Sequence, residues 1–191
     1  MKQNEYFKKE LGYIKDDNIR ESAIYMLDIL PSYFFEIPAS STGKYHPKFA
    51  SAEHGLVKHT KVAVRIAYEL LNDEALHHFS AEEKDLIIMG LILHDGLKSG
   101  LEHSRYTKFE HPLLIANYIK ENKDNLKLNH KQLNTLCKII SSHMGPWNVD
   151  YNGNEVLPVP KSAIERFVHM CDYLSSKKFL DVEFDNIDIK Y

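Results

Sequence analysis

An almost wholly apolar segment at Leu86–Leu93 runs directly into His94, Asp95 and Gly96, and this junction constrains the fold more than any other stretch. A helix over the segment would be apolar on all sides and would therefore lie at the centre of the protein. Its end would carry an imidazole and a carboxylate inward, where an unpaired charge costs several kcal/mol. Two interpretations follow. A divalent metal neutralises the carboxylate, or Gly96 ends the helix as a C-cap and Asp95 pairs with a lysine.

Composition and charge limit the protein class. With 191 residues, 43% hydrophobic and 27% charged, the chain predicts a soluble globular protein that forms a single domain over residues 1–191. The formal net charge of −3 disfavours sequence-independent binding of long nucleic acid. The N-terminus has no apolar leader and no uncharged apolar stretch is long enough to cross a bilayer, so we expect a cytoplasmic protein with no membrane contact. Cys137 and Cys171 lie in apolar helical patterns and are expected in the core.

Apolar residues recur at helical spacing in six segments, and no segment outside the loops has a clear strand pattern. Asp17 or Asn18 is expected to cap the first helix, and Ser80 with Glu83 forms a capping box before the central segment. The stretch from Pro31 to Glu53 lacks periodicity and is long, which is typical of functional or disordered loops. The predicted helices cover about 17–30, 55–72, 81–95, 111–119, 131–143 and 161–178.

Four more potential metal ligands lie on inward faces or at the ends of these predicted helices. His59 lies on the apolar face of its helix, and His143 closes the apolar face of the helix over 131–143. His111 falls at a helix cap, and Asp172 lies beside the apolar face of the last helix. One inward histidine is more often a packed core residue than a ligand, but chance explains the whole series poorly.

The order His, His-Asp, His, His, Asp on successive helices resembles the HD-domain superfamily of metal-dependent phosphohydrolases. The resemblance covers about residues 27–178, with an N-terminal helical extension and a peripheral tail over 181–191 outside it. It implies an all-α helical bundle with the site between helices. It also implies one ion held by His59, His94, Asp95 and Asp172, and, in members with a second ion, a site formed by His111 and His143 with Asp95 shared.

The segment from Pro38 through His59 also resembles the HD module of bacterial 3′-to-5′ exoribonucleases. Those enzymes carry an oligonucleotide-binding barrel before the module, whereas too few residues precede it here to form one. Processive RNA degradation is therefore not expected. The usual family wording after the His-Asp doublet is x-Gly-Lys, and this chain has Gly96, Leu97 and Lys98 in its place.

The resemblance and the ligand types together predict an enzyme that hydrolyses a phosphate ester of a nucleotide or short nucleic acid. Two divalent ions can activate water and stabilise the attacking and leaving oxygens of an in-line displacement. One or two ions are expected, and the histidine and carboxylate ligands suit Mn²⁺, Fe²⁺, Co²⁺, Ni²⁺ or Zn²⁺. The alternative is a catalytically silent HD-fold module that binds metal or nucleotide. Asp95 and Lys98 are the expected catalytic residues, and the expected substrate contacts are Lys98, Lys44, His46 and Arg105.

Overall fold

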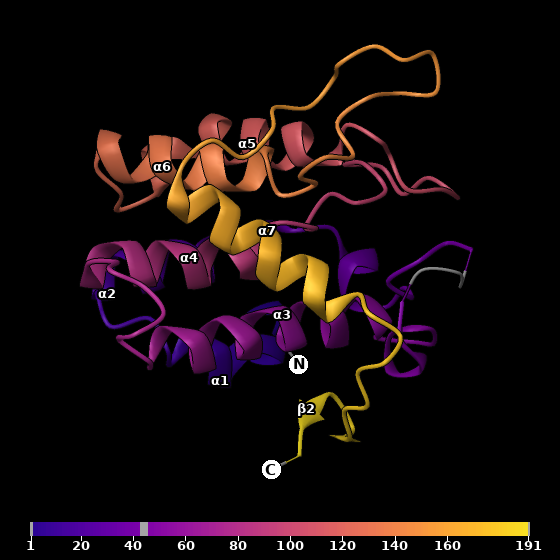
Figure 1. Ribbon diagram of the computed structural model, residues 1–191, viewed down its shortest axis with the longest axis horizontal. Coiled ribbons are helices and arrows are strands. Elements are labelled where there is room, and N and C mark those ends of the chain that lie inside the picture. Colours follow the sequence, from indigo (N-terminus) through magenta and orange to yellow (C-terminus); the bar gives the residue numbers. More distant parts are fainter. Residues whose placement is uncertain (1, 43–45, 191) are drawn as a thin grey trace.

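The computed structural model describes residues 2–42 and 46–190, and over these residues it is mostly helical, as expected (Figure 1). A two-stranded antiparallel hairpin, β1 (Phe184–Asp185) and β2 (Asp188–Ile189), is the only sheet in this part of the chain. Short 3-10 turns cover Gln3–Phe7, Ser32–Phe35, Lys48–Ala50 and Lys123–Asn125. The α-helices are α1 (Lys8–Leu11), α2 (Asp17–Ile29), α3 (Gly55–Leu71), α4 (Ala81–Leu93), α5 (His111–Glu121), α6 (His130–Ser141) and α7 (Ala163–Ser175).

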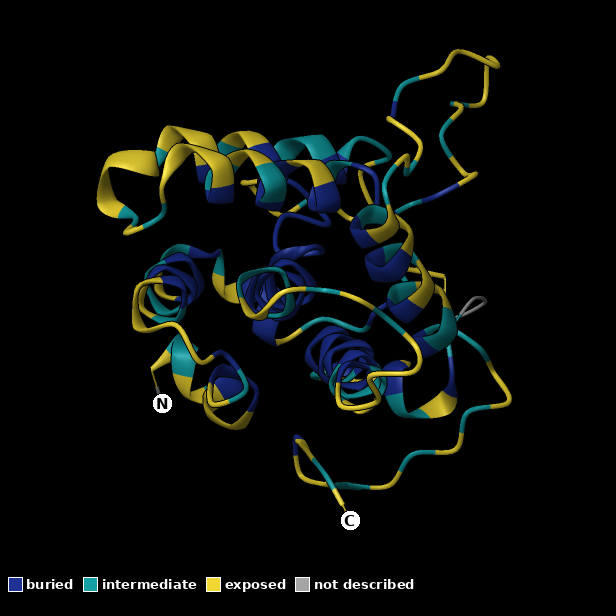
Figure 2. Cartoon of the chain, turned by 60° about the vertical axis from the view of Figure 1, so that its left-hand side comes forward, coloured by how far each residue is buried: buried dark blue, intermediate teal, exposed yellow. Residues whose placement is uncertain are grey.

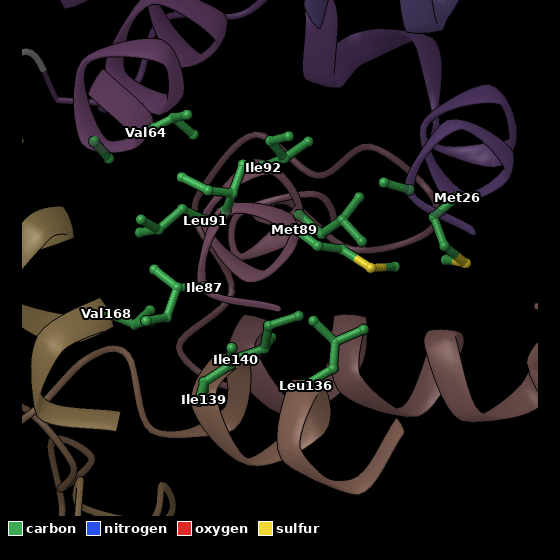
Figure 3. Packing of buried hydrophobic residues seen from close by; sticks show 14 of the residues in the cluster. Met26, Val64, Ile87, Met89, Leu91, Ile92, Leu136, Ile139, Ile140 and Val168 are labelled. Atoms are coloured by element: carbon green, nitrogen blue, oxygen red, sulfur yellow. The ribbon is translucent and has the colours of Figure 1, made fainter. Parts of the chain in front are cut away.

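Helix α4 lies at the centre of the bundle and contacts α2, α3, α6 and α7 (Figure 1). Every residue from Asp85 to Leu93 is buried, because the helix has no polar face to turn toward solvent. Figure 3 shows Ile87, Leu91 and Met89 of this helix among apolar side chains from its neighbours. Figure 2 shows the complementary pattern, with buried residues on the faces that helices turn toward one another. The predicted central position of this segment is confirmed.

Helix starts follow local capping chemistry. Ser80 and Glu83 form the predicted capping box at the start of α4. The prediction for α2 was wrong by one residue, since its cap is Asp16, whose carboxylate accepts hydrogen bonds from the amides of Asn18 and Ile19. Asp16 and its neighbours are all polar, so the sequence alone did not distinguish them as caps.

The C-terminal hairpin lies at the edge of the molecule but is tied to a buried lysine (Figure 1). Lys61 of α3 is almost fully buried, and its ammonium lies 2.6 Å from a carboxylate oxygen of Asp188 and 3.2 Å from one of Glu10. The two acidic partners compensate for the desolvation of the ammonium group. Lys61 therefore links the N-terminal helix α1 and the hairpin to the side of α3. None of the helices in the described part of the chain has the length and apolar character that crossing a bilayer requires.

Asp85 of α4 is buried and accepts hydrogen bonds from the backbone amides of Lys15, at 2.9 Å, and Asp16, at 2.7 Å. Asp85→Ala would leave both amides without a partner, so we expect the free energy of unfolding to fall by about 3 kcal/mol. Urea denaturation measures this loss. Asp124→Ala removes an exposed carboxylate from a 3-10 turn and should change stability by less than about 0.5 kcal/mol. Equal stability of the two variants would contradict the anchoring role of Asp85.

Candidate metal centre

Five helices deliver the six candidate ligands to one place. His59 comes from α3, His94 and Asp95 follow α4, His111 opens α5, His143 follows α6, and Asp172 lies in α7. Their donor atoms form three overlapping groups, each with all atoms within 4.8 Å of one another: His59, His94 and Asp95; His94, His143 and Asp172; and Asp95, His111 and His143. The sequence-predicted set is therefore brought together completely, from positions more than a hundred residues apart.

Asp95 lies between two pairs of histidines. Its Oδ1 atom lies 3.0 Å from Nε2 of His111 and 3.8 Å from Nε2 of His143. Its Oδ2 atom lies 3.5 Å from Nε2 of His94 and 3.7 Å from Nε2 of His59. One carboxylate oxygen thus faces each pair, which is the arrangement that a carboxylate shared between two ions requires.

Asp172 adds a second carboxylate to the centre. Its Oδ1 atom lies 3.0 Å from Nε2 of His59 and 3.3 Å from Nε2 of His94. The side chain is 17% exposed, in contrast to the nearly inaccessible histidines and Asp95. Asp172 therefore lies nearest to His59 and His94, and one of its oxygens is also within 4.8 Å of a ring nitrogen of His143.

The same local contact orients three of the four histidines. The Nδ1 atoms of His94, His111 and His143 each lie 2.7 to 2.8 Å from the backbone carbonyl three residues earlier, in Leu91, Lys108 and Ile140. A carbonyl oxygen can only accept a hydrogen bond, so each Nδ1 carries the proton and donates it. In the neutral ring the lone pair is then on Nε2, which points into the centre.

Ser175 fixes His59 in the same tautomer by a different route. The Ser175 hydroxyl donates to the carbonyl oxygen of Asp172 at 2.7 Å, and it lies 3.1 Å from Nδ1 of His59. Since its proton is already used, the hydroxyl accepts a hydrogen bond from Nδ1. Ser175 lies one helical turn after Asp172, a spacing that could have identified it from the sequence as a residue on the same helix face.

The donor atoms fit a divalent metal ion better than they fit one another. The Nε2 atoms of His59 and His94 are buried and have no hydrogen-bond partner among the described residues. The Nε2 atoms of His111 and His143 lie 3.2 Å apart, and each Nδ1 donates to a backbone carbonyl, so the two Nε2 lone pairs would face each other if neither ring carried a second proton. Facing lone pairs repel unless a cation is bound to them, and imidazole nitrogens with carboxylates suit first-row divalent ions.

The electrostatics of the site also call for positive charge. Burial alone would raise the pKa values of Asp95 and Asp172, but Lys98 and His94 outweigh it for Asp95, and His94 and His59 for Asp172, so both pKa values lie well below the usual range. Burial would lower the pKa of His94, yet the two carboxylates raise it to about 9. Burial, with His94 and His111, lowers the pKa of His143 to about 3. The two carboxylates thus hold positive charge beside them, in the Lys98 ammonium and in a proton on His94, and a metal ion bound at Nε2 of His94 would take the place of that proton.

Lys98 pairs with Asp95, and its Nζ atom lies 2.5 Å from Oδ2 of the carboxylate. This is the lysine partner that one interpretation of the apolar segment expected. The other half of that interpretation is wrong, since Gly96 does not adopt the left-handed conformation of a C-cap. Gly96 is instead closely packed, since a Cβ atom there would lie 2.8 Å from a methyl carbon of Leu30, which would have to move, and 3.1 Å from the carbonyl oxygen of Leu93.

A cavity of about 570 Å³ opens onto the centre. His46 lines it, with its ring edge-on to His59 at 4.7 Å between centroids, and the buried Nδ1 atom of His46 has no hydrogen-bond partner. Arg105 does not line the cavity. Its side chain is exposed and its guanidinium lies over the ring of Tyr106, so the structure does not support Arg105 as a substrate contact. Lys44 lies outside the described residues.

Sequence reasoning missed several residues that line the cavity. The segment Ala39–Thr42 forms part of the wall, which is consistent with a functional loop between Pro31 and Glu53. Trp147 also lines the cavity, and its position four residues after His143, directly behind a Gly-Pro helix break, was a usable signal. The remaining lining residues that were missed are Thr107, Met144, Ser176 and Lys177.

With this fold and centre described, comparison with protein families gives one match. The family model described as HD domain matches residues 56–177, a range that contains all six candidate ligands. The chain therefore belongs to the HD-domain family, whose members bind divalent metals and are typically metal-dependent hydrolases. No curated protein and no solved structure matches the chain.

The position of Asp95 predicts the metal content of a variant. Protein purified without chelator should carry divalent metal, and Asp95→Ala should lose nearly all of it because Asp95 faces both histidine pairs. Elemental analysis by mass spectrometry measures the metal per chain. Asp181→Ala, which removes an exposed carboxylate, is the control and should bind metal normally. An unchanged metal content in Asp95→Ala would exclude Asp95 as a ligand.

The two histidine pairs predict a partial loss. His111 faces only Oδ1 of Asp95, whereas His59 faces Oδ2 and Asp172. In a centre with two ions, His111→Ala should therefore retain about half of the bound metal. His130→Ala, an exposed histidine on α6, should retain all of it. If His111→Ala binds as much metal as the unmodified protein, the centre holds a single ion on the His59 side.

Proposed function

We propose that this protein is a metal-dependent phosphohydrolase that cleaves a phosphate ester of a nucleotide or short nucleic acid. The observation that carries the proposal is the placement of Asp95 between two pairs of imidazole Nε2 atoms whose tautomers are fixed by their own Nδ1 contacts. His59, His94, Asp95 and Asp172 would hold one ion, and His111, His143 and Asp95 a second. Mn²⁺, Fe²⁺, Co²⁺, Ni²⁺ and Zn²⁺ all suit these donors.

The ions would supply Lewis acidity, which polarises phosphoryl oxygens and favours ionisation of water near neutral pH. The side chains of the protein orient the substrate. The Lys98 ammonium lines the cavity beside Asp95 and can neutralise a phosphoryl oxygen. The His46 imidazole lines the cavity and can contact a polar substrate group. Because the centre is buried at the base of the cavity, bulk water is kept away from the reacting groups.

Cavity size and net charge favour small substrates. A cavity of about 570 Å³ lies within the usual range for small-molecule sites. The net charge of −3 gives no long-range attraction for an extended polyanion. The proposed substrate is therefore a nucleotide or the end of a short strand.

One observation favours the alternative of a silent HD-fold binding module. The Lys98 ammonium already neutralises the Asp95 oxygen that faces His59 and His94. A protein that kept this ion pair permanently would have one carboxylate oxygen fewer for metal. Activity measured on protein of known metal content decides between the two functions.

The test uses release of p-nitrophenol from bis-p-nitrophenyl phosphate by protein reconstituted with each divalent metal. We expect metal-dependent turnover that Asp95→Asn reduces by at least about a hundredfold. Lys98→Ala should keep its metal and lose about tenfold or more in kcat/KM, because it removes a charge that contacts the substrate. Asp181→Asn is the matched control and should be fully active. Metal-loaded protein without turnover on this diester or on nucleotides would support the silent module.

A further inference from the structure

Trp147 is the single tryptophan of the chain, and it lies at the cavity of the metal centre with 51% of its surface exposed. Tryptophan carries the largest apolar surface of any side chain, and its exposure to water is unfavourable unless a partner covers it. The indole shares the cavity with Lys98, Asp95 and the histidines. A ligand bound in this cavity can therefore contact the indole and the metal centre at the same time.

The indole is held in place from behind. Its ring is stacked on the ring of Tyr173 in α7, with centroids 5.5 Å apart and planes at 19°. The Lys177 ammonium lies 3.3 Å from the Tyr173 centroid, which continues the layered arrangement. His169 lies at the edge of both rings, 6.0 Å from Trp147 and 5.9 Å from Tyr173. A flat aromatic surface is thus fixed before any ligand binds.

A tight turn sets the distance between this surface and the metal centre. Gly145, between His143 and Trp147, has a φ of +63°, and an added Cβ atom would lie within 2.2 Å of the His169 ring. Only glycine satisfies both conditions. Nδ1 of His169 also lies 2.7 Å from the carbonyl oxygen of His143. His169 therefore ties the candidate ligand and the tryptophan to the same helix.

We propose that Trp147, supported by Tyr173, is a stacking surface for a nucleobase whose attached phosphate reaches the metal centre. This inference rests on the proposed phosphohydrolase function and specifies its substrate as one that carries a base. A nucleobase is a flat π system, and in a nucleotide the sugar links it to a phosphate ester. Ser40, Thr42 and Thr107 also line the cavity, and their hydroxyl groups can bind the sugar or the base edges.

Stacking does not read hydrogen-bonding groups, so the subsite should accept every base. Discrimination should instead be between substrates with and without a base. A free nucleotide and the end of a strand both carry a base linked by a sugar to a phosphate. The test therefore compares the two. A second nucleotide is not required for the stacking contact.

The binding test uses the fluorescence of Trp147, which reports on this subsite alone because the chain has no other tryptophan. The probes are a nucleoside phosphonate, in which a P–C bond replaces the hydrolysable P–O bond, and the matching base-free ribose phosphonate. With metal present, the nucleoside phosphonate should quench the fluorescence and bind about tenfold or more tightly than the base-free probe. A dinucleotide phosphonate with the same terminal base should bind within about threefold of the mononucleotide probe if one base is stacked.

The variants test the contact by calorimetry and kinetics. Trp147→Ala should weaken nucleoside phosphonate binding about tenfold to a hundredfold and raise KM for nucleotides, with ribose 5-phosphate unaffected. Trp147→Phe keeps a stacking ring and should restore binding to within about threefold. Tyr151→Ala is the control. Tyr151 lies in the same segment between α6 and α7 as Trp147, but it is 97% exposed and does not line the cavity. Circular dichroism checks that each variant is folded.

The outcomes separate this inference from the proposed function. Equal affinity for the two phosphonates, or normal nucleotide KM in Trp147→Ala, overturns the stacking surface, and metal-dependent diester hydrolysis still stands in that case. Quenching by the nucleoside phosphonate in the unmodified protein, together with calorimetric binding that weakens in Trp147→Ala and recovers in Trp147→Phe, supports the surface. If that quenching occurs in metal-loaded protein that hydrolyses no phosphoester, the subsite is supported and the hydrolase function fails.

Discussion

Burial of the Asp95 carboxylate is the constraint on which the rest of the site depends. Helix α4 has no polar face, so it can only lie inside the bundle, and its end must carry Asp95 into a region of low dielectric. An unpaired carboxylate there would strongly destabilise the fold. The bundle compensates with the Lys98 ammonium and with imidazoles from three other helices and from α4 itself. The groups that stabilise the buried Asp95 carboxylate in the fold are therefore the same groups that form the candidate metal centre.

The protein orients its histidines mainly by local means. His94, His111 and His143 each lie at or near a helix terminus, and each ring uses the carbonyl three residues earlier to fix its tautomer. Helix ends leave backbone carbonyls or amides without helical partners, so such contacts also satisfy polar groups of the backbone. Only His59, in the middle of α3, needs a side chain from another helix, and Ser175 supplies it. The centre is preorganised before any ion binds.

The cavity has two chemically different kinds of lining residue. Carboxylates, imidazoles and Lys98 line one part of it, and the indole of Trp147 lines another. The turn at Gly145 joins them, because it follows His143 and precedes Trp147 by only two residues. A substrate that contacts both the metal centre and the indole must combine a phosphate with a flat apolar group. This combination explains why an exposed tryptophan belongs to the same site as a buried metal centre.

The sequence by itself determined the central position of α4, the capping box at Ser80 and the inward face of His59, because periodicity and capping are local properties. Family resemblance added the grouping of the six candidate ligands. Only the tertiary structure decided that the two oxygens of Asp95 face different histidine pairs and that Arg105 does not line the cavity. These features depend on loop paths and on the docking of helices distant in the chain. No local pattern encodes them, since they arise from packing in three dimensions.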